Sequence, residues 1–70
     1  MVRIFKTNVS NLIQGNHIMR SLLAHFPNSV INFDLEDCDN ILRVDARGVQ
    51  SEDIVSQLQN LGFQCIEIEG

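Results

Sequence analysis

The stretch that decides the fold is SVINFDLEDCDNILRVDARG, residues 29–48. Apolar and polar residues alternate on both sides of its centre, and such a period of two is typical of strands with one buried and one solvated face. The polar run EDCDN, residues 36–40, supplies the turn. We therefore predict a β-hairpin. Its inward residues are Ile31, Phe33 and Leu35 in the first strand and Leu42, Val44 and Ala46 in the second.

The other face of this hairpin carries charges of both signs. Asp34 lies in the first strand, and Arg43, Asp45 and Arg47 follow the turn. Acidic and guanidinium side chains on neighbouring strands attract one another, by roughly a few tenths of a kcal/mol for each pair. We expect such pairs across the solvated face.

Upstream of the hairpin, residues 2–9 mix β-branched and aromatic residues with rough alternation, which predicts a strand. A helix is expected next, with Ser10 or Asn11 as its N-cap and with its end just before Pro27. Its apolar residues recur at helical spacing. This stripe consists of Gly15, Ile18, Met19, Leu22 and Phe26.

Downstream, a second helix is predicted to begin at Ser51 as the cap, with Glu52 and Asp53 in the first turn, where the helix dipole favours negative charge. Gly62 suits the left-handed residue that ends such a helix. The final stretch FQCIEIE, residues 63–69, predicts a strand with Ile66 and Ile68 on one face. The buried stripe of this helix is Ile54, Leu58 and Leu61.

The element order is therefore βαββαβ. This order predicts an α+β, ferredoxin-like fold: a four-stranded antiparallel sheet of order 4-1-3-2 with both helices on one face. Seventy residues make a single domain, residues 1–70. In this topology the segments 8–14, 36–40 and 62–65 meet at one end of the sheet.

Composition excludes several classes of function. The net charge is −4 and no basic run occurs, so nucleic acid is not an expected partner. No apolar run is long enough to cross a bilayer and no signal sequence is visible, so we expect a cytoplasmic chain without membrane insertion. No catalytic triad, phosphate-binding glycine loop or carboxylate pair is present. We therefore expect neither an enzyme nor a cofactor.

The stretch FKTNVSNLIQ, residues 5–14, resembles the heavy-metal-associated domain family, which includes small copper and zinc chaperone modules. That family has the pattern Phe-Lys-Thr-Asn, an apolar residue, a spacer and then Cys-x-x-Cys. The run from Phe5 to Val9 matches this pattern, and Ser10 is the spacer. Asn11 and Gln14 stand at the two cysteine positions. The runs ILRV, from residue 41, and I…L…LGF, residues 54–63, are also similar.

The resemblance implies a metal site at the start of the first helix, but this chain departs from it there. Soft ions such as Cu(I) require thiolates, and an amide provides only a neutral oxygen. We therefore assign no metal ligand to Asn11 or Gln14. Domains of this family meet their partners through this loop, so the resemblance implies a protein-interaction or regulatory module that binds a partner, or itself, there.

The predicted interaction loop comprises Ser10, Asn11, Leu12, Ile13 and Gln14, with Phe63 beside it. Leu12 and Ile13 stand where the family has small or polar residues between its cysteines. They either cover the core or form an exposed apolar patch. Both alternatives are open at this point.

A second hypothesis is a soft-metal protein that uses Cys38 or Cys65. The expected strand order separates these thiols by about 12 Å. That distance is too large for a disulfide or for one shared ion, so a second copy or a partner would have to supply further ligands. The thiols are otherwise expected to be free. His17 and His25, eight residues apart, are expected to be solvated.

Overall fold

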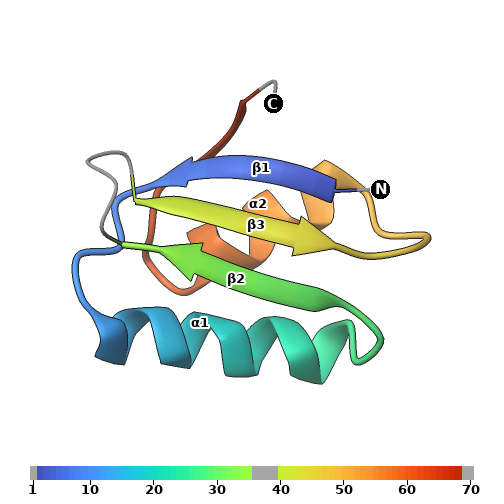
Figure 1. Ribbon diagram of the computed structural model, residues 1–70, viewed down its shortest axis with the longest axis horizontal. Helices are drawn as coiled ribbons and strands as arrows, with labels where there is room; N and C mark the ends of the chain where they lie inside the picture. Colours follow the sequence, from blue (N-terminus) through green and yellow to red (C-terminus); the bar gives the residue numbers. More distant parts are fainter. Residues whose placement is uncertain (1, 36–39, 69–70) are drawn as a thin grey trace.

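The computed structural model describes residues 2–35 and 40–68 of the chain. The elements are β1 (Val2–Thr7), α1 (Leu12–His25), β2 (Val30–Asp34), β3 (Ile41–Asp45), α2 (Ser51–Asn60) and β4 (Cys65–Ile68). The strands form one antiparallel sheet in the order β2-β3-β1-β4 (Figure 1). The predicted ferredoxin-like α+β fold and its strand order are confirmed.

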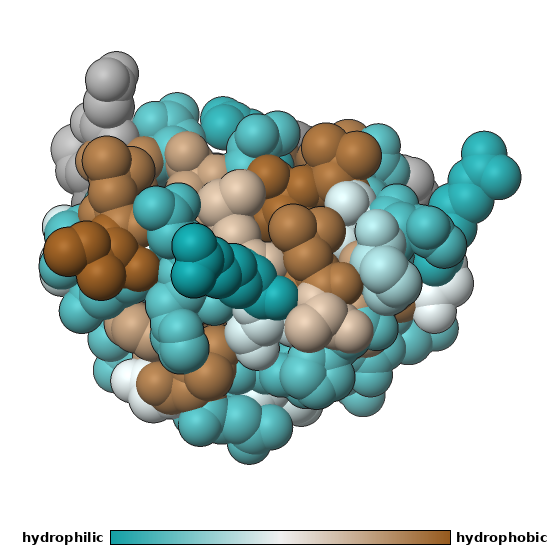
Figure 2. Space-filling view, turned by 90° about the horizontal axis from the view of Figure 1, so that it is seen from below, coloured by the Kyte–Doolittle hydropathy of each residue, from teal (hydrophilic) through white to brown (hydrophobic). Residues whose placement is uncertain are grey.

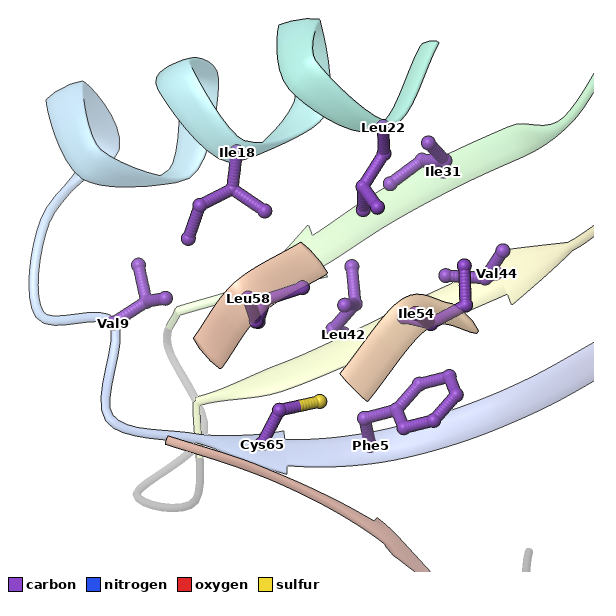
Figure 3. Close-up of a cluster of buried hydrophobic side chains, with 10 residues drawn as sticks. All are labelled: Phe5, Val9, Ile18, Leu22, Ile31, Leu42, Val44, Ile54, Leu58 and Cys65. Carbon is purple, nitrogen blue, oxygen red and sulfur yellow. The ribbon is translucent and has the colours of Figure 1, made fainter. Parts of the chain in front are cut away.

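The core lies between the two helices and one face of the sheet (Figure 3). Strand pairing puts Phe5 and Leu42 opposite each other, so both side chains point to the same face. Ile18 of α1 and Leu58 of α2 cover that face and are fully buried. The inward faces of β2 and β3 are apolar, and Phe5 and Cys65 add apolar side chains from β1 and β4, so the helices pack on this face. The buried cluster consists of Phe5, Val9, Ile18, Leu22, Ile31, Leu42, Val44, Ile54, Leu58 and Cys65.

The hairpin follows its predicted pattern. Ile31 is buried, and Phe33 and Leu35 pack against the core from its margin. On the solvated face, Arg43 Nη1 lies 3.7 Å from an oxygen of Asp34, as expected for pairing across the strands. Both side chains are substantially exposed, so this ion pair contributes at most about 1 kcal/mol. The turn residues 36–39, which include Cys38, lie outside the described residues.

The first helix begins where one of the two candidate caps predicts. Asn11 is its N-cap, and the helix ends at His25, with Phe26 as its C-cap before Pro27. Met19 and Phe26 are half-buried against the core.

The second helix differs from the prediction by one residue. Its N-cap is Gln50, and Ser51 is the first helical residue. The backbone amide of Gln50 donates to the Asp53 carboxylate at 3.0 Å. The Ser51 hydroxyl accepts from Arg3 at 2.7 Å and donates to Glu67 at 2.6 Å. Ser51 therefore tethers α2 to strands β1 and β4 rather than capping the helix. At the other end, Gly62 has the predicted positive φ of 91°.

The Cys65 side chain of the last strand, β4, points into the core. Cys65 is 5% exposed and faces inward, whereas Ile66 is 65% exposed on the face of the sheet that the helices leave uncovered. Ile66 and Ile68 do share a face, as predicted, because they are two residues apart in a strand. Neither described helix is long and apolar enough to cross a membrane.

Candidate functional site

Two long-range hydrogen bonds hold together the end of the sheet where β1 runs into α1. The Thr7 hydroxyl donates to the backbone carbonyl of Asn40 at 2.8 Å. The backbone amide of Gln64 donates to the side-chain oxygen of Asn8 at 2.8 Å. The start of β3 and the segment before β4 are thus both tied to the end of β1, at the left of Figure 1. This convergence was predicted from the topology.

The two residues at the cysteine positions of the resembled family hold the loop closed. The Asn11 side-chain oxygen accepts from the backbone amide of Gln14 at 2.9 Å. The Gln14 side-chain oxygen in turn accepts from the backbone amide of Ser10 at 2.9 Å and from its hydroxyl at 3.0 Å. This reciprocal arrangement resembles a capping box and satisfies amides that the helix start leaves unpaired. The two amide side chains thus stabilise the start of α1.

Asn11→Ala is expected to lower the free energy of unfolding by about 1 kcal/mol, because it removes the acceptor for an unpaired helix amide. Asn11→Asp keeps that acceptor and adds a charge that the helix N-terminus favours, so it is expected to be neutral or stabilising. Urea denaturation followed by circular dichroism measures both. Equal losses in the two variants would show that the cap contributes nothing.

Leu12 and Ile13 do not fold down onto the core. Their exposed fractions are 71% and 82%, the largest among the described large apolar side chains. Both belong to the first turn of α1, whose N-cap network holds the backbone beneath them. Figure 2 shows a brown apolar patch at its left, where α1 begins. Of the two alternatives for this pair, the structure therefore shows the exposed patch.

A groove lies beside this pair, between α1 and strand β2 at the edge of the sheet. It has a volume of about 490 Å³ and is lined by Leu12, Phe33, Asp34, Leu35 and Arg43. Gly15 faces β2, and a methyl group at this position would fit in ordinary van der Waals contact, 3.6 Å from the Phe33 ring and 3.8 Å from the Leu35 side chain. The apolar part of the groove is formed by Phe33 and Leu35, which are half-buried at the edge of the core. Its charged part is the ion pair of Asp34 and Arg43.

Phe63, the predicted neighbour of the loop, is half-buried. Its ring packs against the core, and its backbone amide donates to the carbonyl of Leu58 at 2.9 Å, ending α2. The exposed apolar surface of this end is therefore formed by Leu12 and Ile13, together with the groove. We call this the loop surface.

The described thiol, Cys65, is buried and holds its proton at neutral pH. Burial, assisted by the negative charge of Glu67, raises the pKa of Cys65 to about 11, so its thiolate is scarce. Residues 2–35 and 40–68 contain no group of three or more His, Cys, Asp or Glu side chains able to hold a metal ion. His17 and His25 are exposed, as predicted. A metal bound through Cys38 stays a prediction, because Cys38 lies outside the described residues.

Sequence reasoning located the loop but missed the groove. The groove depends on how closely α1 approaches β2, which is a tertiary feature. The one local signal was Gly15, a glycine within the buried stripe of the helix, which faces the groove residues Phe33 and Leu35. Comparisons of the chain with protein-family models, with curated proteins and with solved structures found no match.

Proposed function

We propose that this chain is a non-catalytic protein-interaction domain that binds its partner through the loop surface. One observation carries the proposal: two adjacent branched apolar side chains, Leu12 and Ile13, are 71% and 82% exposed in a turn whose backbone is held by side-chain hydrogen bonds. Burying one such side chain is worth roughly 1.5–3 kcal/mol. A partner that covers the pair therefore gains affinity from few residues, as at an interaction hot spot.

The rigidity of this turn supports the same proposal. The reciprocal bonds of Asn11 and Gln14 fix the backbone that carries Leu12 and Ile13, so binding loses little conformational entropy there. In the heavy-metal-associated domains that this chain resembles, the corresponding loop contacts the partner protein. The proposal keeps that docking role and gives the amide side chains a structural role in place of metal binding.

A photo-reactive amino acid at position 13 is expected to form a discrete cross-linked protein product in cell extract, because that position faces the partner. The matched control carries the same group at Gln59, which is exposed on α2. The product is expected to be absent with the control and to fade when Leu12→Ser is added. Denaturing gels followed by mass spectrometry read the result. The same products from both positions would contradict the proposal.

A further inference from the structure

We propose that the partner of the loop surface docks as an extended peptide segment, which adds a fifth strand to the sheet at the free edge of β2. Alternate side chains of this segment occupy the groove beside Leu12. The inference rests on the proposed function and deepens it, since it names the conformation and chemistry of the partner. It is carried by the unpaired edge of β2 and by the groove that follows this edge.

The backbone of β2 has one free side. Within residues 2–35 and 40–68, β2 ends the sheet order and pairs with β3 alone. In an antiparallel pair, the backbone amide and carbonyl of every second residue point away from the partner strand. Val30 and Asn32 are exposed, so this strand is open to solvent. A row of such unpaired backbone groups is a template for another extended chain.

The other edge of the sheet, β4, is protected against such pairing, and β2 is not. β4 has four residues, and its Glu67 lies on the same face as Cys65, where it accepts a hydrogen bond from Ser51 of α2 at 2.6 Å. Short edge strands and inward charges both oppose strand addition. In the five residues of β2, the side chains on the helix-covered face are Ile31 and Phe33, and the strand contains neither lysine nor proline. β2 is therefore the edge that accepts a strand.

The groove follows the edge of β2. Three consecutive residues, Phe33, Asp34 and Leu35, all line it, together with Arg43 and with Leu12 of α1. Because consecutive residues of an extended chain point to opposite faces of a sheet, a recess lined by all three wraps around the edge. α1 runs alongside β2 in Figure 1 and supplies the far wall of the groove. An added strand therefore meets both free backbone groups and an apolar recess.

An extended chain is the occupant that this edge selects. A helix satisfies its backbone hydrogen bonds internally, so it would leave the edge groups of β2 unpaired. A strand pairs with them and turns every second side chain toward the apolar lining of Leu12 and Phe33. Its other side chains point to the solvated side, where Asp34 and Arg43 already pair with each other. The recognised segment therefore has apolar residues at every second position.

The charge of the chain narrows this chemistry further. A net charge of −4 repels an acidic segment and attracts a basic one. Since the ion pair at the groove needs no charge from the partner, the alternating positions of the segment are free to be neutral or basic. The expected ligand is a neutral or basic peptide with a period of two.

The first experiment selects peptides of about eight residues, a usual strand length, from a random display library on the immobilised full chain. Enriched peptides are expected to carry apolar residues at every second position and few acids. Fluorescence polarisation then measures their affinity. Leu12→Ser is expected to weaken binding about tenfold or more, because a large apolar side chain leaves the groove. Ile66→Ser is the control, since Ile66 is also largely exposed but lies in β4, and it is expected to bind like the wild type.

The second experiment tests strand pairing itself, without changing the protein. The tightest peptide is synthesised in two forms, N-methylated at its odd or at its even positions. Only one set of amides faces β2, so one form is expected to bind about tenfold or more weakly while the other binds like the parent peptide. Amide hydrogen exchange, followed by NMR, is expected to slow in β2 and not in β4 when the parent peptide binds.

Four outcomes would overturn the inference: no enriched peptide, apolar residues enriched at helical spacing, equal effects of the two methylation patterns, or protection of β4 in place of β2. Exchange in β2 that slows with chain concentration alone would identify a second copy as the occupant and would also overturn it. The cross-linking result separates these failures from failure of the proposed function. A specific product at position 13, together with any of these outcomes, leaves the interaction domain standing and removes strand addition as its mode of binding.

Discussion

Phe5→Ala is expected to lower the free energy of unfolding by about 3–5 kcal/mol. Phe5 is fully buried at the centre of β1, opposite Leu42, and lies in the cluster of Figure 3 with Ile54. Truncating a buried phenylalanine costs about 3–5 kcal/mol, from lost burial and from the cavity left behind. A domain of this length has a total stability of roughly 4–10 kcal/mol. One substitution therefore removes a large share of it.

Ile66→Ala is the matched control for this prediction. Ile66 lies in β4, which pairs with β1 on the side opposite β3. It points away from the core and is 65% exposed. Its loss is expected to cost less than about 1 kcal/mol. Thermal and urea denaturation measure both variants. Similar losses at Phe5 and Ile66 would show that the uncovered face of the sheet is buried in solution, as in an oligomer.

Raising the pH from 9 to 11 is expected to lower the free energy of unfolding by roughly 2 kcal/mol through Cys65 alone. The folded protein holds the thiol proton until about pH 11, because burial and then Glu67 disfavour the thiolate, whereas the unfolded chain releases it near 9.0. Between these values the folded state binds more protons than the unfolded state. Stability therefore falls as pH rises through this window, and below pH 9 the contribution is fully present.

Few other groups obscure this measurement. The chain has no tyrosine and a single lysine, Lys6. Denaturation is carried out in a Cys38→Ser background, so that Cys65 is the one thiol left to titrate. Adding Cys65→Ala is expected to flatten the stability profile between pH 9 and 11. An unchanged slope after that substitution would assign the pH dependence to another group and contradict a buried thiol.

The same burial predicts that Cys65 reacts slowly with thiol reagents in the folded protein, since only the thiolate reacts. In the folded protein Cys65 lies in the buried cluster near Phe5 (Figure 3), and its raised pKa leaves little reactive thiolate at neutral pH. This is why Cys65 contributes to the core and not to the loop surface, although both lie at the end of the sheet where β4 begins.

Local patterns were sufficient for the architecture. The alternation in residues 29–48 and the stripes of two helices specify the apolar faces that pack together in the core. The ends of elements were harder to predict. Ser51 has the chemistry of a cap, yet its hydroxyl is engaged by Arg3 and Glu67, residues distant in the sequence. A competing tertiary contact therefore moved the cap to Gln50.

The sequence by itself determined the fold, the absence of thiols at positions 11 and 14, and the position of the loop within the fold. Only the tertiary structure decided what that loop presents. Leu12 and Ile13 have the hydrophobicity of core residues, but they lie in the first turn of α1, where the described part of the chain leaves them 71% and 82% exposed. Cys65 and Ile66 are adjacent and both suited to a core, and the pairing register of β4 with β1 buried the first and exposed the second. Burial is set by what packs above a residue, and that is specified by the whole chain rather than by its local pattern.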